Sequence, residues 1–308
     1  MSNRNEVVRD IKRDWQLYLF LLIPLAYIII FAYVPMVGLQ IAFRDFTGRL
    51  GMWNSPWVGF EQFEEFFNSF YFSRLIKNTL ILSAYSIICS FPFPIIMALL
   101  MNCMRNRHVK NVCQTIVTLP HFISVVVLVG MMFQFFNSRN GIYGNLYHSI
   151  YGLFPADPFA SPTLFRHFFI WSGVWQNYGW NSILYLAALA GVDPALHEAA
   201  TIDGASRFQR VLHVDFPTIL PTVVIMLIMR TGSVMTIGFE KVWLMQNSAN
   251  LETSEVISTY VYKVGLASSG NTDFSYSTAI GFFNSVINLV LISVVNKISD
   301  RLSGNSMW

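Results

Sequence analysis

One stretch of the chain, "WSGVWQNYGWNSILY", combines the side-chain types that bind sugars. Trp171, Trp175 and Tyr178 recur at spacings of four and three residues, so a helix would carry them on one face. The amides beside them are Gln176, Asn177 and Asn181. Aromatic faces stack on the apolar faces of sugar rings, and amides bond sugar hydroxyls. Trp and Tyr also collect where a membrane meets water, so this pattern leaves a sugar site and an interfacial belt both open.

A single charge, Arg230, interrupts the apolar stretch "IMLIMRTGSVMT". A charge at the centre of a bilayer costs about 2.5–3.5 kcal/mol on insertion scales, so we expect Arg230 to face a cavity or an anionic partner. It could line a transport path and bind sugar hydroxyls or a carboxylate. Alternatively, it could form an ion pair or bond carbonyls within the protein. Glu240 lies ten residues on, nearer the outer surface, and is a poor direct partner.

Other polar groups in apolar stretches give weaker signals. Asn284 and Asn288 lie four residues apart and could line the same path or bond a neighbouring helix. We expect His121 to be a satisfied core residue, and no histidine pair has metal-ligand spacing. The sequence contains no nucleophile–base pair that would indicate catalysis. No G-x-x-x-x-G-K-[ST] loop occurs, so we expect no catalytic residue, no metal and no cofactor in this chain.

The segment "GVDPALHEAATIDGASRFQRV" is polar yet lies between apolar stretches. Asp193 followed by Pro194 is a favourable helix start. Gly204 suits the left-handed conformation that turns a chain, after which a second short helix can begin. We therefore expect a helical corner over residues 193–212. Its short side chains would let another protein approach the backbone closely, although an ordinary polar loop remains the alternative.

The composition places these residues in a membrane protein. The 308 residues are 54% hydrophobic and only 12% charged, whereas soluble domains carry about 25% charged residues. A membrane-crossing helix needs about 20 apolar residues. Six stretches fit, and they cover residues 17–34, 79–101, 111–138, 167–192, 216–239 and 274–296. We expect an all-α integral membrane protein with six spans.

Basic residues predict the orientation of these spans. They lie before the first span, between spans two and three, within the polar corner and after the last span. This side is expected to be cytoplasmic, which puts both termini there. The outer segment "GFEQFEEFFNSF" alternates acids with Phe and could either lie along the interface or cap the helices.

The polar corner resembles a known signature. "EAATIDGASRFQRVLHVDFPTILP" is similar to the EAA motif of permease subunits of binding-protein-dependent ABC importers. The matching positions are Glu198-Ala199-Ala200, Asp203-Gly204-Ala205 and Val214-Asp215-Phe216-Pro217. Stretches such as "GFEKVWLMQNSANLETSEVISTYVYKVGL" and the terminal Met307-Trp308 extend the resemblance to the sugar-permease branch with LplB-type polysaccharide permeases.

The resemblance implies a MetI-like transmembrane domain in a bacterial cytoplasmic membrane. Its parts would be a cytoplasmic segment over residues 1–16, the spans over 17–296 with their core at 75–296, and a tail over 297–308. The corner would be a coupling helix that enters a cleft of the ATPase. The residues expected to carry this coupling are Glu198, Ala199, Ala200, Asp203, Gly204, Ala205, Arg207 and Phe208.

The resemblance also implies a set of partners. These are a second related permease that forms a heterodimer with this chain, two copies of an ABC ATPase that bind ATP and magnesium, and an extracytoplasmic binding protein. The cargo would be an oligosaccharide, and an acidic, uronate-containing one would suit Arg230. Monosaccharides, glycerol phosphodiesters and peptides remain alternatives. A self-sufficient secondary transporter is less favoured, because no acid lies within an apolar span.

Overall fold

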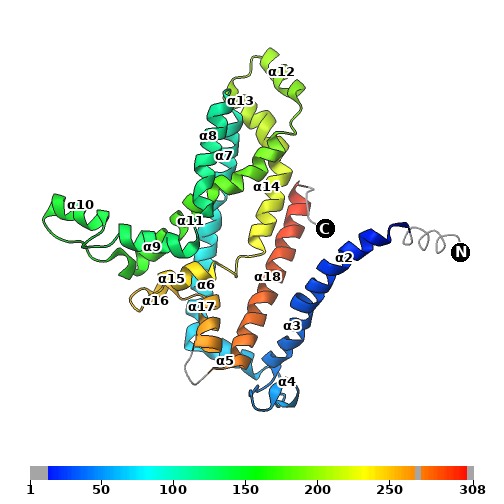
Figure 1. Ribbon diagram of the computed structural model, residues 1–308, viewed down its shortest axis with the longest axis vertical. Coiled ribbons are helices and arrows are strands. Elements are labelled where there is room, and N and C mark those ends of the chain that lie inside the picture. Colours follow the sequence, from blue (N-terminus) through cyan, green and yellow to red (C-terminus); the bar gives the residue numbers. More distant parts are fainter. Residues whose placement is uncertain (1–12, 268–271, 304–308) are drawn as a thin grey trace. The chain divides into compact units, whose positions relative to one another are not determined.

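A computed structural model describes residues 13–267 and 272–303, and it is helical throughout (Figure 1). Within this part of the chain, β structure is limited to one isolated bridge between Arg44 and Trp57. The basic residues at positions 4, 9 and 12 and the terminal Met307-Trp308 lie outside the described residues. The chain divides into two compact units, residues 1–67 with 264–282, and residues 68–263 with 283–308.

The first unit begins with a long apolar helical rod. Its parts are α2 (Trp15–Ile28), η1 (Ile29–Tyr33), α3 (Val34–Met36) and η2 (Val37–Phe43). They form one candidate membrane span, Trp15–Phe43. No residue of α2 is buried, although the helix is almost wholly apolar. Apolar side chains that face outward along a whole helix are suited to lipid contact.

The acid-and-Phe segment of this unit packs inward through its aromatic face. After α4 (Gly51–Asn54), helix α5 (Glu61–Asn68) buries Phe63 and Phe66, while its acids stay exposed. The Phe66 ring lies 6.3 Å from that of Tyr276, and the Phe63 ring lies 6.1 Å from that of Phe282. This packing favours the capping interpretation of "GFEQFEEFFNSF" over a helix that only rests on the membrane surface.

The second unit is built around one long helix, α11 (Pro162–Leu189). This helix contacts α6 (Phe70–Ser90), α7 (Pro92–Asn102), α8 (Arg107–Thr118) and α14 (Phe216–Thr231). The first half of α11 packs into an apolar core through Phe165, Phe169 and Val174. Its last turns pack into a second core through Tyr185 and Leu189.

The remaining elements of this unit are shorter, apart from the last helix. They are η3 (Leu119–Phe122), α9 (Val125–Phe135), α10 (Ile142–Tyr151), η4 (Pro158–Ala160), α12 (Pro194–Ile202), α13 (Arg207–Arg210), η5 (Val211–Asp215), α15 (Phe239–Met245), α16 (Leu251–Ser254) and α17 (Ile257–Tyr262). Helix α18 (Phe274–Ser303) follows η6 (Lys263–Ala267) and continues from the first unit into the second. Figure 1 shows α12 at the opposite end of the second unit from α16 and α17.

The described residues contain four helices that are long and apolar enough to cross a membrane, not six. These are Trp15–Phe43, Phe70–Asn102, Arg207–Thr231 and Phe274–Arg301, and a bent pair, Arg107–Phe122 with Val125–Phe135, could make a fifth. Helix α11 has 28 residues, about 42 Å at 1.5 Å per residue, so its length suffices. Its amides, serines and basic residues lower its hydropathy, which is why composition alone does not count it as a span.

The expected third span, residues 111–138, is broken. Its two halves meet at an angle of 93°, and Pro120 lies in η3 at the break. Helix α11 holds this bend. Gln176 donates to the carbonyl of Ile123 at 2.7 Å, and His121 stacks on Trp180 with ring centres 4.5 Å apart. His121 also bonds Asn177 at 3.0 Å, so its ring is partnered.

The expected fifth span, residues 216–239, ends early. Helix α14 stops at Thr231, and residues 232–238 form turns with no regular helix. Side chains replace the missing helical bonds there: Ser83 donates to the carbonyl of Val234, and Asn288 accepts from the amide of Met235 at 3.0 Å. Gly232 lies so close to Ile292 that a Cβ would overlap it, so this glycine allows α18 to approach closely. Arg230 is therefore in the last turn of a helix and not in mid-span.

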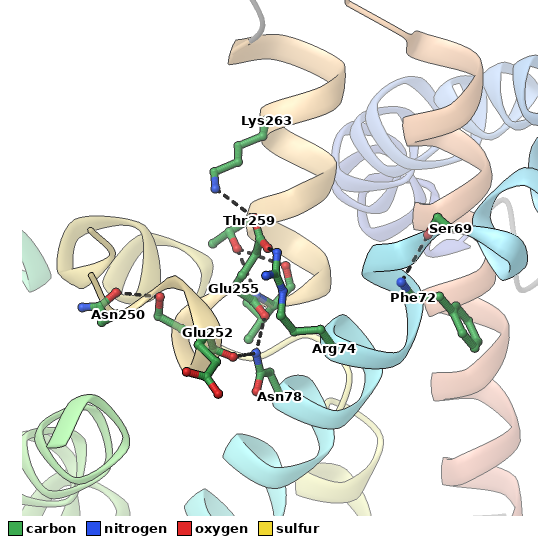
Figure 2. A network of polar contacts seen from close by, with 11 residues as sticks. Ser69, Phe72, Arg74, Asn78, Asn250, Glu252, Glu255, Thr259 and Lys263 are labelled. Atoms are coloured by element: carbon green, nitrogen blue, oxygen red, sulfur yellow. Dashed lines mark hydrogen bonds and ion pairs between the residues drawn. The ribbon is translucent and has the colours of Figure 1, made fainter. Parts of the chain in front are cut away.

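A polar network fixes the segment with α16 and α17 to α6 (Figure 2). The carboxylate of Glu255, 4% exposed, forms ion pairs with Arg74 and with Lys263, the latter at 2.9 Å. Asn78 on α6 donates to the carbonyls of Glu252 and Glu255 at 2.8 and 3.1 Å. Arg166 at the start of α11 donates to the same Asn78 at 3.0 Å. Three segments far apart in sequence thus meet at one cluster.

Replacing Glu255 with Ala is expected to destabilise the protein by about 1.5–3 kcal/mol, the usual cost of a hydrogen bond to a charged group. The substitution leaves two cations beside a buried site without their carboxylate. The melting temperature of the purified protein in detergent measures this loss. Glu252→Ala removes an exposed carboxylate three residues away and should change little. Equal melting temperatures for both variants would contradict a stabilising role of the network.

Candidate functional site

The polar corner is a helix–turn–helix, as the sequence predicts. Asp193 caps α12 by accepting from the amide of Ala195 at 2.9 Å. Gly204 then takes a left-handed φ of +78°, a conformation that residues with a Cβ disfavour. Ser206 and Gln209 form a capping box at the start of α13. Arg210 donates to the hydroxyl of Thr201 at 2.8 Å and thereby ties the two short helices together.

The most exposed side chains of this corner are apolar. Ile202 is 86% exposed and Phe208 is 71% exposed, and neither α12 nor α13 buries any residue. Glu198, Ala199 and Arg207 are exposed as well. A hollow of about 250 Å³ includes Ala200, Asp203, Gly204 and Ala205 in its lining. Exposed apolar side chains beside a shallow hollow are typical of a surface that meets another protein.

A buried acid, Asp215, joins this corner to the end of α7. Asp215 is 3% exposed, and its carboxylate lies 3.2 Å from Nε2 of His197 on α12. The same oxygen accepts from the amide of Asn102, at the end of α7, at 3.2 Å. We define His197, Asp215 and Asn102 as the corner joint. The motif pattern contains Asp215 but gives no hint of this link, because His197 and Asn102 are distant in sequence.

A polar cavity of about 410 Å³ lies between α6, α11, α14 and α15. Its volume is within the range of small-molecule sites. Helix α6 contributes Ser83, Ser86 and Ser90, and the irregular segment after α14 contributes Ser233 and Thr236. The charged residues in its lining are Arg230, Glu240 and Lys241. Hydroxyls, amides and two cations facing one space suit a polar, hydroxyl-rich solute.

Five of the predicted path residues line this cavity, namely Gln176, Asn177, Tyr178, Asn181 and Arg230. Gln176 and Asn177 also hold the bend at residues 119–124, so they have a structural role in addition. Arg230 and Glu240 both border the cavity, yet no ion pair joins them in the described part of the chain. The expectation that Glu240 is not the partner of Arg230 agrees with this geometry.

The other four predicted path residues lie elsewhere. Trp171 and Trp175 line a separate, apolar hollow of about 660 Å³ with Met131 and Phe135, so the expected aromatic face is divided between two spaces. The indole of Trp171 donates to the hydroxyl of Tyr85 at 3.1 Å. Asn288 bonds the irregular segment at residues 232–238, where its amide also donates to the hydroxyl of Thr236 at 2.8 Å. Asn284 does not border the cavity, and its buried carbonyl oxygen has no hydrogen-bond partner among the described residues.

Lys241 is not among the path residues predicted from the sequence. The side chain is 8% exposed and borders the cavity. Its ammonium donates to the carbonyl of Phe169 at 2.9 Å and lies 5.1 Å from the centre of the Phe169 ring. Burial lowers the pKa of Lys241 to about 8. The apolar neighbours in "GFEKVWLM" are a weak signal for a buried lysine, and the adjacent Glu240 obscures it.

Comparison with known proteins identifies the family of the chain. Residues 90–304 match the model described as "Binding-protein-dependent transport system inner membrane component". The chain belongs to this family. Of its members, Protein LplB of Bacillus subtilis (strain 168) is 41% identical over 97% of this chain and 92% of its own length. This relationship makes the chain an all-helical, MetI-like permease subunit of a membrane transport system.

Two further relatives of this permease have more specific names. The polygalacturonan/rhamnogalacturonan transport system permease protein YteP of Bacillus subtilis (strain 168) is 37% identical over the whole chain and 94% of its own length. The solved structure of a bacterial ABC transporter "involved in the import of the acidic polysaccharide alginate" superposes with a TM-score of 0.87 at 39% identity. That match covers 97% of this permease and 99% of the solved chain.

Proposed function

We propose that this permease imports acidic oligosaccharides across a bacterial cytoplasmic membrane, with both of its termini in the cytoplasm. The observation that carries the proposal is the polar cavity with two cations, Arg230 and Lys241, and with amides from α11. Two relatives that align along nearly their whole length are named for acidic polysaccharides, polygalacturonan and alginate. Carboxylates and hydroxyls of such sugars match this lining in charge and in hydrogen-bonding capacity.

The proposed machine contains several partners. A second permease completes the path, two copies of an ABC ATPase bind and hydrolyse ATP with magnesium, and an extracytoplasmic binding protein delivers the sugar. The corner with exposed Ile202 and Phe208 is the proposed seat of the ATPase. A second solved structure of the alginate transporter is in complex with a "pentasaccharide-bound periplasmic protein", which supports delivery by a binding protein. This chain itself performs no catalysis.

Reconstitution in lipid vesicles tests the proposal. Vesicles that contain this chain, its second permease, its ATPase and its sugar-loaded binding protein are expected to accumulate a short oligogalacturonide or oligoalginate only with ATP. Vesicles with this chain alone are expected to accumulate nothing. Uptake by the chain alone would contradict a subunit role. Uptake restricted to a monosaccharide, a glycerol phosphodiester or a peptide would contradict the proposed cargo.

A further inference from the structure

Lys241 is a buried cation that borders the cavity and has no carboxylate partner among the described residues. Within the same residues its ammonium has one hydrogen-bond acceptor, the carbonyl of Phe169, although an ammonium can donate three hydrogen bonds. None of the ion pairs among the described residues involves Lys241. Glu240 is adjacent in sequence but exposed, and it is not within ion-pairing distance of Lys241 in that part of the chain.

The surroundings of this lysine would suit an apolar residue better. Its chain neighbours on α15, Val242 and Met245, are fully buried in the apolar core. An unpaired charge that is removed from water destabilises a fold. The ammonium lies close to the backbone of α11 at Gly173, where a Cβ would make ordinary van der Waals contact with Nζ at 3.4 Å. Among the described residues, the buried charge at position 241 is met by one hydrogen bond to a backbone carbonyl and by the Phe169 ring, and its lowered pKa reports a net cost of burial.

We propose that Lys241 selects acidic cargo, and that its ammonium binds the carboxylate of a uronate unit held in the cavity. This inference rests on the proposed function and names the residue that would give it specificity. Arg230 is exposed at the cavity, where its planar guanidinium can bind a second acidic group or sugar hydroxyls. The amides of Asn177 and Asn181 can bond hydroxyls. Lys241 is the buried member of this set, so a carboxylate that reaches it leaves water and is held more strongly.

The proposal has a consequence for pH. The free ammonium has a pKa of about 8, so it is charged below that pH and loses its attraction for a carboxylate as the pH rises above it. Other charged or titratable groups that line the cavity are Arg230, Glu240 and Tyr178. Of the helices packed on α15, α9 has no charged or titratable side chain and α17 has Tyr260 and Tyr262. Helix α11 has Arg166, His167 and Tyr185 in addition to Tyr178. Lys241 is therefore the cavity-lining cation to which this pH dependence is assigned.

Three substitutions separate charge from structure in the complete reconstituted complex. Lys241→Gln keeps a donor for the carbonyl of Phe169 but has no charge, Lys241→Met has neither, and Lys241→Arg keeps the charge at all accessible pH values. Lys77→Met removes an exposed lysine that does not border the cavity and is the matched control. The probe is a labelled short oligogalacturonide, and the measurements are kcat and KM for uptake from the loaded binding protein, and the pH profile of uptake.

We expect Lys241→Gln and Lys241→Met to lower kcat for the acidic probe roughly ten-fold or more, the effect of one lost charged hydrogen bond. KM for the loaded binding protein should stay unchanged, because docking does not involve the cavity. We expect uptake by the unmodified complex to decline above pH 8, and Lys241→Arg should retain uptake without that decline. Lys77→Met should behave like the unmodified complex.

Two results would overturn the inference in distinguishable ways. If the unmodified complex imports the acidic probe and Lys241→Gln imports it with the same kcat and pH profile, Lys241 does not select the cargo and the proposed function stands. If the unmodified complex imports a neutral oligosaccharide or a glycerol phosphodiester but neither oligogalacturonide nor oligoalginate, the proposed cargo fails and the role of Lys241 fails with it.

Discussion

Glu198→Arg combined with Gly204→Trp is expected to abolish co-purification of the permease with its ATPase while the membrane helices stay folded. Gly204 has a φ of +78°, and an L side chain there adds about 1–2 kcal/mol of local strain. The indole would also fill the hollow beside Ala200 and Ala205, and the arginine would reverse a charge on the exposed face of α12. Affinity purification followed by quantification of the ATPase measures the loss.

The matched control places the same kinds of change away from the corner. Gly152 also has a positive φ, +71°, with no atom within 4 Å of a Cβ, and Glu65 is exposed. Gly152→Trp with Glu65→Arg should retain the ATPase. Size-exclusion profiles of both variants report whether the helices remain assembled. A corner variant that binds the ATPase in the same amount as the control would show that the ATPase docks elsewhere.

Asp215→Ala is expected to lower the number of sugars imported per ATP hydrolysed about ten-fold, with the ATPase still bound. The substitution removes the acceptor that joins His197 of α12 to Asn102 of α7. A hydrogen bond to a charged group contributes about 1.5–3 kcal/mol, and 1.4 kcal/mol corresponds to a factor of ten. Without the corner joint, movement of α12 would no longer be transmitted directly to α7. Paired measurements of uptake and ATP hydrolysis in vesicles give the ratio.

Two further variants define the role of the corner joint. Asp215→Asn keeps an acceptor without the charge, and we expect a ratio between those of the unmodified permease and Asp215→Ala. Asp300→Ala removes an exposed acid from α18 and should leave the ratio unchanged. An unchanged ratio in Asp215→Ala, at normal melting temperature, would mean that the joint only stabilises the fold.

Local features of the structure are the ones that could be predicted. The corner follows from an N-cap at Asp193, a left-handed glycine at 204 and a capping residue at Ser206, all signals within a few residues. The last span follows from an unbroken apolar run, and α18 covers it with a few extra residues at the end. Counting apolar residues fails where side chains replace helical bonds. Residues 232–238 contain no charged side chain and so extend the apolar stretch, but Ser83 and Asn288 bond part of their backbone in place of helical hydrogen bonds.

The cavity could be predicted only in part, because its lining comes from segments distant in sequence. The amides of α11 and Arg230 are conspicuous as polar groups in apolar stretches, and they do meet. Lys241 is not conspicuous, since it follows Glu240 in what composition assigns to an outer loop. Helical spacing places Trp171 and Trp175 on one face with Tyr178. When a helix borders a different cavity on each of two adjacent sides, residues of one face can line different cavities, and the spacing does not indicate which residue lines which.

Helices α8 and α11 approach each other closely at Gly179. A Cβ at this position would overlap the backbone of Val117, so the two main chains are in direct contact there with no side chain between them. Helix α11 leads within a few residues to α12. A displacement of the corner would therefore be transmitted through α11 to α8 at this contact, and a larger residue at position 179 would force the two backbones apart.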